Sequence, residues 1–252
     1  MTLVRSIIYT IYLFASMTFV GLMFLPGVIV SGRSAAARAA HVWAKMALAG
    51  LRVICGITHE VRGLDKLPSG AALIACKHEA MWETLFFLAL FKDPAVVLKK
   101  ELLELPIYGW YAAKLEMIVV DREQGASAIR HLARQAEQMM KQGRPLVIFP
   151  EGTRMAPGAP PDYKPGIALL YQRLGLPVVP AALNSGLYWQ GGIKRRPGRI
   201  VIEFLDPIPP GLERAAFMAT LQGRIETACQ ALRDGAEADA MSSQNRLKVA
   251  DA

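Results

Sequence analysis

The strongest constraint on the fold is an apolar stretch close to the N-terminus. From Ile7 to Val30 the chain carries no charged residue. As a helix, the part before Pro26-Gly27 is about 28 Å long, close to the hydrocarbon thickness of a bilayer. The stretch therefore predicts a membrane helix. Ser34-Ala35-Ala36-Ala37 could be a signal-peptide cleavage site, but the apolar region is longer than an ordinary signal core, which favours an uncleaved anchor.

Basic residues flank this stretch unequally. Arg5 precedes it, whereas Arg33, Arg38 and Lys45 follow it. Positively charged flanks tend to stay in the cytoplasm. We therefore expect a membrane protein whose catalytic part lies at the cytoplasmic face of the inner membrane.

The next segment, 41–55, carries a polar stripe on an otherwise apolar helix. Arg38, His41, Lys45 and Arg52 share one narrow side of the helix. Such a helix can lie in the membrane interface with its basic edge toward lipid phosphates. It can equally be a buried helix of a soluble domain, and the residues alone leave both interpretations open.

Composition narrows the class of partner. Lysine and arginine total 29 against 21 acidic residues, the net charge is +8, and 53% of residues are hydrophobic. This combination favours an anionic membrane surface over nucleic acid, for which no binding module is recognisable. The three cysteines form no C-x-x-C pair, so we expect neither a disulfide scaffold nor a metal site.

Beyond residue 57 the chain alternates between strand-like and helix-like segments, as an α/β domain does. Strands are expected at 58–62, 71–76, 95–98, 117–120, 146–149, 178–183 and 199–204. The clearest amphipathic helix covers 124–142, and a closing helix covers 213–233. The domain thus spans 57–234, and the polar, alanine-rich segment 235–252 is expected to be a disordered tail.

The most informative chemical motif is the pair His78 and Glu83, five residues apart. Positions with this spacing do not face each other on a helix. We therefore place His78 in a loop before a helix over 79–91, from whose first turn Glu83 reaches back to one imidazole nitrogen. The other nitrogen can then take a proton from a hydroxyl group. Alone, the pair could also be a surface histidine and a helix-capping glutamate; a zinc-protease helix would need a second histidine where Trp82 stands.

A second polar cluster, Glu151 to Arg154, follows the strand expected at 146–149. Gly152 allows close backbone approach, Thr153 offers a hydroxyl, and Arg154 offers a planar fork suited to phosphate oxygens. We interpret the cluster as a phosphate cradle, although such a sequence is often only a turn.

Lys99 and Lys100 end the strand expected at 95–98. They could supply positive charge for a donor or acceptor phosphate, or simply form a solvated face. The sequence supports the two interpretations equally.

Four blocks in order resemble the glycerolipid acyltransferase family, in particular the lysophosphatidic acid acyltransferases. The family signature is a histidine, four residues and an aspartate, and Glu83 stands where aspartate is usual. Glu151 to Arg154 matches a second block, Val120-Asp121-Arg122 a third, and Val178 to Asn184 a fourth. The resemblance covers about 59–204.

The resemblance implies a glycerolipid-acyltransferase-like sheet flanked by helices, with an N-terminal membrane-associated helical segment over 1–56. It implies that His78 is a general base oriented by Glu83, and that Arg122 joins Arg154 in holding the acceptor phosphate. No metal or other cofactor is expected.

The implied reaction is acyl transfer from acyl-CoA or an acyl carrier protein thioester to the sn-2 hydroxyl of lysophosphatidic acid, which gives phosphatidic acid for phospholipid biosynthesis. Because Gly-x-Ser-x-Gly is absent, transfer without an acyl-enzyme is favoured. Two alternatives stay open: the same chemistry on another lysolipid, such as lyso-ornithine lipid, and a non-catalytic membrane lipid-binding protein.

Overall fold

The computed structural model describes residues 1–120, 125–189 and 191–250. At its centre is a seven-stranded sheet in the order β1-β7-β6-β2-β5-β3-β4. Neighbouring strands run parallel, except that β6 and β7 are antiparallel. The strands are β1 (Ile57–Arg62), β2 (Leu73–Cys76), β3 (Ala95–Lys99), β4 (Ile118–Val120), β5 (Leu146–Ile148), β6 (Val178–Leu183) and β7 (Gly198–Phe204).

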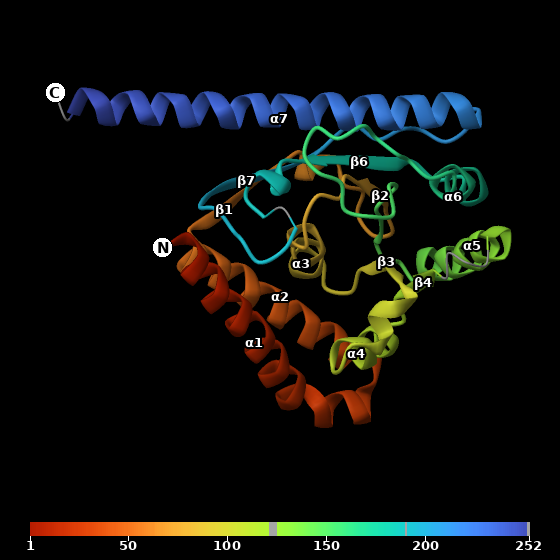
Figure 1. Cartoon of the computed structure of the whole chain (residues 1–252). Coiled ribbons are helices and arrows are strands. Elements are labelled where there is room, and N and C mark those ends of the chain that lie inside the picture. The colour runs from red at the N-terminus through yellow and green to blue at the C-terminus, as the bar shows by residue number, and fades with distance from the viewer. Residues whose placement is uncertain (121–124, 190, 251–252) are drawn as a thin grey trace.

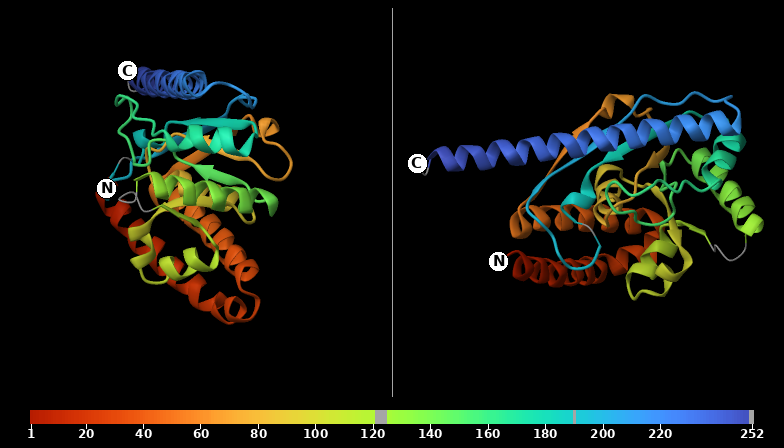
Figure 2. Two further views of the ribbon diagram at one scale, coloured as in Figure 1. Left: turned by 90° about the vertical axis from the view of Figure 1, so that its right-hand side faces the viewer. Right: turned by 45° about the horizontal axis from the view of Figure 1, so that its top comes forward.

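Helices cover both faces of the sheet (Figures 1 and 2). One layer contains α1 (Thr2–Ser31), α2 (Arg33–Cys55), α3 (Trp82–Leu90) and α4 (Tyr108–Lys114). The other contains α5 (Gly125–Lys141), α6 (Gly166–Leu174) and α7 (Arg214–Ala250). Three short 3-10 turns are η1 (Leu64–Lys66), η2 (Lys100–Glu104) and η4 (Ser185–Leu187).

The strands β2, β3, β5, β6 and β7 contribute to two hydrophobic cores. In β2, Ile74 and Cys76 pack with α1 to α4, whereas Leu73 and Ala75 pack with α5 to α7. Because both faces of this largely parallel sheet are covered, its inner strands β2, β3, β5 and β6 are almost entirely apolar, which made them recognisable in the sequence, whereas β1 was recognisable by its alternation. The expected α/β sheet flanked by helices is confirmed.

The helices α1 and α2 form an antiparallel pair joined at Gly32. The predicted apolar helix lies within α1, the one helix in the described ranges that is long and apolar enough to cross a membrane. One side of α1 is nevertheless attached to α2. Tyr9 is fully buried and its hydroxyl donates to the carbonyl of Ala47 at 3.1 Å. The rest of the helix leaves large apolar side chains exposed, including Leu3, Val4, Ile11, Phe19 and Leu22.

Segment 41–55 lies within α2, and the two sides of this helix differ in burial. Its alanine-rich side is buried against α1 and α3. His41 is half-buried, with Nδ1 3.1 Å from the carbonyl oxygen of Leu88 in α3. Arg38, Lys45 and Arg52 remain exposed. One side of the segment is therefore buried in a hydrophobic core that it shares with the sheet, and its basic edge faces outward, so its position in the membrane interface stays a prediction.

The C-terminal segment differs from the expectation. Residues 235–250, which were expected to be a disordered tail, continue the helix α7. The segment is rich in alanine and contains no proline, and the single Gly235 costs a helix only about 1 kcal/mol. The short helices α4 and α6 were not predicted, because neither is long enough to show a clear apolar periodicity.

Candidate active site

The two polar motifs leave neighbouring strands at the same edge of the sheet. β2 and β5 are parallel, with Ala75 opposite Ile148, so His78 and Glu151 follow them on the same side. Lys99 ends β3, which is parallel to β5, and belongs to this edge too. The topology therefore gathers the candidate residues at carboxyl ends of strands, where open α/β sheets build their sites.

The central contact of the site joins His78 and Glu83. His78 Nδ1 lies 2.8 Å from Glu83 Oε1, so the predicted bond is confirmed. The predicted start of the helix at Glu79 is wrong, because α3 begins at Trp82. The loop amides of Glu79 and Ala80 donate to the same Oε1 at 2.6 and 2.7 Å, so the carboxylate closes a loop ahead of the helix.

The two side chains of this pair differ in exposure. Glu83 is fully buried in the first turn of α3, where the helix dipole favours a negative charge. The His78 side chain is 15% exposed. In the part of the chain that the structure describes, no hydrogen bond engages its Nε2. This nitrogen is thus available to a substrate hydroxyl.

Ser185 is a member of the site that the sequence did not reveal. It lies in η4, after β6, and its hydroxyl donates to Glu83 Oε2 at 2.9 Å. The next amide, of Gly186, donates to Glu79 Oε2 at 2.9 Å. Both contacts arise because β6 lies beside β2 in the sheet, which no local sequence pattern indicates.

Glu79 occupies an unusual environment beside this pair. It is 1% exposed, and its Oε1 has no hydrogen-bond partner among the described residues. Burial, the largest cause, and the nearby Glu83 together raise the pKa of Glu79 to about 7, against the opposing effects of the bond from Gly186 and the charges of Lys77 and Arg233. Glu79 therefore titrates near neutral pH next to the carboxylate that holds His78.

The residues on either side of the cluster 151–154 contact His78. The Phe149 ring stacks on the imidazole with centroids 4.1 Å apart and an 18° angle between the planes. The amide of Met155 donates to the carbonyl oxygen of His78 at 2.8 Å. These contacts orient the imidazole ring and set the path of the loop, so the two sequence motifs pack against each other in one site.

Glu151 does not have the position that its place in the phosphate cradle implied. Its carboxylate is fully buried and accepts from Lys77 Nζ at 2.7 Å, and Lys77 also donates to Glu226 of α7 at 2.8 Å. Burial alone would lower the pKa of Lys77, but these two carboxylates raise it above its ordinary value. In this arrangement Glu151 holds the loop to the domain and does not face a ligand.

The remaining cradle residues lie on the surface. Gly152 has a φ of +67°, which allows the loop to turn. Thr153 and Arg154 are exposed, and within the described ranges Arg154 forms no ion pair. Lys99 and Lys100 are also exposed. Arg122, the second arginine expected to bind phosphate, lies outside the described residues.

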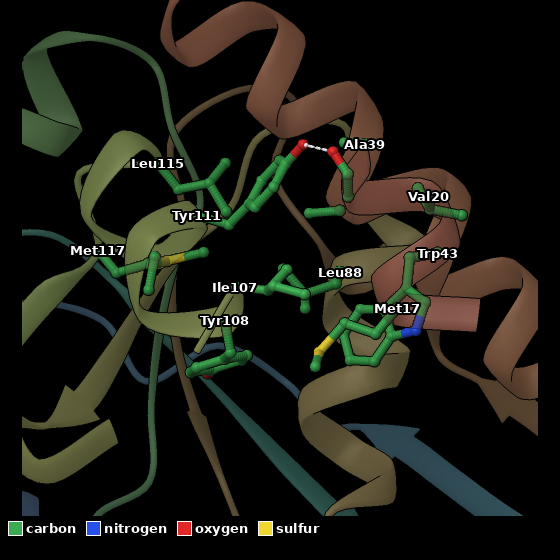
Figure 3. Close-up of a pocket in the computed structure, with 13 residues that line it drawn as sticks. Met17, Val20, Ala39, Trp43, Leu88, Ile107, Tyr108, Tyr111, Leu115 and Met117 are labelled. Atoms are coloured by element: carbon green, nitrogen blue, oxygen red, sulfur yellow. Dashed lines mark hydrogen bonds between the residues drawn. The ribbon is translucent and has the colours of Figure 1, made fainter. Parts of the chain in front are cut away.

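An apolar cavity of about 50 Å³ lies between α1, α2, α3 and α4 (Figure 3). Tyr111 closes one side, and its hydroxyl donates to the carbonyl of Gly21 at 2.7 Å. The other walls are apolar, with Met17, Val20, Trp43, Leu88, Ile107, Leu115 and Met117 among the lining residues. Among the described residues, no group of three or more His, Cys, Asp or Glu side chains could hold a metal ion.

Comparison with known proteins gives consistent findings. The model of the family described as Acyltransferase matches residues 58–184. The 1-acyl-sn-glycerol-3-phosphate acyltransferase of Pseudomonas aeruginosa is 38% identical over 185 residues, 73% of this chain and 72% of that protein. The enzyme of the same name from Helicobacter pylori is 28% identical over 170 residues, 65% of this chain and 71% of that protein.

A solved structure shares the fold. The crystal structure of the 1-acyl-sn-glycerophosphate (LPA) acyltransferase from Thermotoga maritima aligns with a TM-score of 0.74 over 92% of this chain and 98% of that chain, at 20% sequence identity. The family match covers the segment that carries His78, Glu83 and the 151–154 loop. This chain therefore belongs to the acyltransferase family.

Proposed function

We propose that the protein transfers an acyl chain from a thioester donor to the sn-2 hydroxyl of lysophosphatidic acid and so forms phosphatidic acid. The observation that carries this proposal is the 2.8 Å contact between His78 and the buried Glu83, which leaves Nε2 open. The relatives in Pseudomonas aeruginosa and Helicobacter pylori are named for this activity.

His78 acts as the general base. Nε2 accepts the proton of the acceptor hydroxyl while the oxygen attacks the thioester carbonyl, and Glu83 stabilises the imidazolium that forms. When the tetrahedral intermediate collapses, the C–S bond breaks and the imidazolium returns its proton to the leaving thiolate. Ser185 does not act as a nucleophile, because it is fully buried and its hydroxyl donates to Glu83.

Arg154 holds the phosphate of the acceptor. The amide of its neighbour Met155 donates to the carbonyl oxygen of His78, so the backbone that carries Arg154 lies next to that of the base. A planar fork binds two phosphate oxygens at once and orients the hydroxyl toward Nε2. Gly152 and Thr153 shape this loop, and Arg122, Lys99 and Lys100 are proposed to add further positive charge.

The acyl chains and the membrane lie on the side of α1 and α2. The cavity of Figure 3 is apolar, as a hydrocarbon chain requires. Because α1 is bonded to α2 along one side, we propose that it lies in one leaflet with its apolar side chains in the lipid, at the cytoplasmic face. The donor is acyl-CoA or an acyl carrier protein thioester.

The test is acylation by the purified full-length protein. The protein is incubated with each donor and with lysophosphatidic acid, other lysophospholipids or lyso-ornithine lipid, and products are identified by mass spectrometry. His78→Ala should reduce turnover by at least about 10²-fold, since a positioned base contributes 10²–10⁴-fold. His131→Ala, which removes an exposed histidine of α5, is the matched control.

Each other outcome excludes one part of the proposal. Preferred acylation of a lysolipid without a phosphate would reject lysophosphatidic acid as the acceptor. A His78→Ala protein within about tenfold of the wild type would remove His78 from the mechanism. Absence of turnover with every acceptor and donor would leave a lipid-binding protein.

A further inference from the structure

A buried arginine far from the candidate site lacks a counter-ion. Arg195, in the chain between η4 and β7, is 4% exposed. Its Nη1 donates to the carbonyl of Ser6 at 3.0 Å, to Thr10 Oγ1 at 2.9 Å and to the carbonyl of Ile193 at 2.8 Å. Its Nε is buried without a hydrogen-bond partner, and no carboxylate of the described chain pairs with it.

The guanidinium is stacked between two aromatic rings. Its central carbon lies 4.6 Å from the ring centroid of Tyr9 and 4.3 Å from that of Trp189. Such cation–π contacts are stabilising when they are desolvated. Removing a charge from water is unfavourable, and all the hydrogen-bond acceptors around Arg195 are neutral. The environment holds the guanidinium in a fixed position but leaves its charge uncompensated.

Arg195 borders a cavity that contains a second arginine. The cavity has a volume of about 270 Å³ and is lined by Met1, Thr2, Arg5, Cys55, Arg195 and Pro197. Arg5 is exposed and forms no ion pair within the described residues. No acidic side chain lines the cavity. Two arginines line this cavity and no acid does, so the cavity suits an anion, and it is large enough for a phosphate group.

The side chains around the cavity indicate what kind of molecule carries this anion. Leu3 and Val4, in the same turn of α1 as Arg5, are 55% and 60% exposed. Ile193, beside the exposed Lys194, is 53% exposed. Figure 2 shows the chain before β7 reaching the N-terminal end of α1, where the backbone amide of Arg195 bonds Ser6 Oγ at 2.9 Å. Apolar side chains next to basic ones are typical of a surface at the boundary between lipid tails and headgroups.

We propose that this cavity, formed by Arg5 and Arg195 at the first turns of α1, binds the headgroup phosphate of an anionic phospholipid. None of its lining residues belongs to the candidate active site, so the proposal does not depend on the proposed function. The bound phosphate supplies the missing counter-ion of Arg195 and holds the N-terminal end of α1 at headgroup depth.

The test is vesicle flotation with the full-length protein. Vesicles contain phosphatidylcholine alone or phosphatidylcholine mixed with phosphatidylglycerol, which is neither acceptor nor product of the proposed reaction. A charge-assisted hydrogen bond is worth about 1.5–3 kcal/mol, so Arg5→Gln should weaken binding to the mixed vesicles by about 10- to 150-fold. Arg196→Gln removes an exposed charge that does not line the cavity, and should cost about fivefold or less, as a single surface charge does.

Arg195→Gln should weaken binding at least as much as Arg5→Gln. Because Arg195 is buried, the melting temperature of the Arg195→Gln protein in detergent is measured to check that it folds. If this variant does not fold, the result with Arg5→Gln, at an exposed position, decides the test. Equal losses in Arg5→Gln and Arg196→Gln would overturn the site in favour of diffuse attraction. In a second arm, wild-type protein in detergent is heated with inorganic phosphate and with chloride at equal ionic strength. A higher melting temperature in phosphate that is absent in Arg5→Gln, together with flotation that phosphatidylglycerol does not increase, would overturn the lipid as the source and leave a site for free phosphate.

Discussion

Replacing Glu83 by glutamine tests whether this side chain acts through its charge. Oε1 accepts hydrogen bonds from His78 Nδ1 and from the amides of Glu79 and Ala80. Three donors at one atom require an acceptor there, so the glutamine must place its carbonyl oxygen at this position. Its NH₂ group then faces Ser185, whose hydroxyl can rotate to accept. The substitution thus keeps the geometry and removes only the charge.

The magnitude of the effect follows from two estimates. A charge-assisted hydrogen bond exceeds a neutral one by about 1 to 1.5 kcal/mol. Two charges about 4 Å apart in a medium of effective dielectric about 20 interact by about 4 kcal/mol. The charge of Glu83 matters most when His78 carries a proton, which happens in the transition state. We therefore expect Glu83→Gln to lower kcat by about 10- to 1,000-fold and to leave the acceptor KM nearly unchanged.

The assay is a set of initial rates at saturating donor with lysophosphatidic acid varied. Glu83→Asp keeps the charge but is one methylene shorter, so it cannot hold both His78 and Ser185 in this geometry, and it should lose less activity than Glu83→Gln. Glu213→Gln, at an exposed carboxylate just before α7, controls for loss of a charge elsewhere. If the glutamine variant turns over as fast as the wild type, the charge has no role, and Glu83 only closes the loop before α3.

Three further predictions concern the residues around this pair. Arg154→Lys keeps the charge but loses the planar guanidinium fork. The acceptor KM should therefore rise by about 10- to 150-fold while the donor KM stays within about twofold. An acceptor saturation curve that does not change would refute the phosphate contact. The pKa of Glu79 is about 7 in the fold, against an ordinary value of 4.5. The contribution of this group to stability is therefore present below about pH 4.5 and is lost as the pH rises to 7, about 3 kcal/mol in all. Glu79→Gln should therefore flatten the dependence of unfolding free energy on pH over this range, as measured by denaturant titration, and an equally steep curve would contradict the assignment. Lys77→Met leaves Glu151 buried and unpaired and should cost about 3–5 kcal/mol of unfolding free energy. The double variant Lys77→Met/Glu151→Gln should recover part of this loss. Equal losses in the single and the double variant would argue against the pair.

Contacts of the site between residues that are close in sequence could be predicted from the sequence. The spacing of His78 and Glu83 excludes a shared helix face, so a loop followed by a helix was the arrangement that allowed contact, and the structure contains it. The start of α3 was predicted too early because Glu83 holds two loop amides that a longer helix would have used. The strands were predictable because buried parallel strands are apolar on both faces.

The other parts depend on which strands are neighbours. Ser185 reaches Glu83 across 102 positions, and Lys77 reaches Glu151 across 74. Such contacts follow from the strand order, in which β6 and β5 lie on either side of β2. No spacing rule in the sequence encodes that order. Glu151 was therefore predicted to contact the ligand phosphate, whereas it forms a buried ion pair with Lys77.

The attachment of α1 to Arg195 sets an order of events during synthesis. Ser6 and Arg195 are 189 positions apart, whereas Tyr9 bonds Ala47 across only 38. At about 5–20 residues per second, the ribosome needs about 10–40 s to synthesise the chain between Ser6 and Arg195. During that time α1 can fold first against α2 and later against α4, and the apolar rest of its surface needs lipid or a chaperone. The pairing of α1 with α2 is therefore an early step of biogenesis, and the polar contacts at the N-terminal end of α1 are among the last to form.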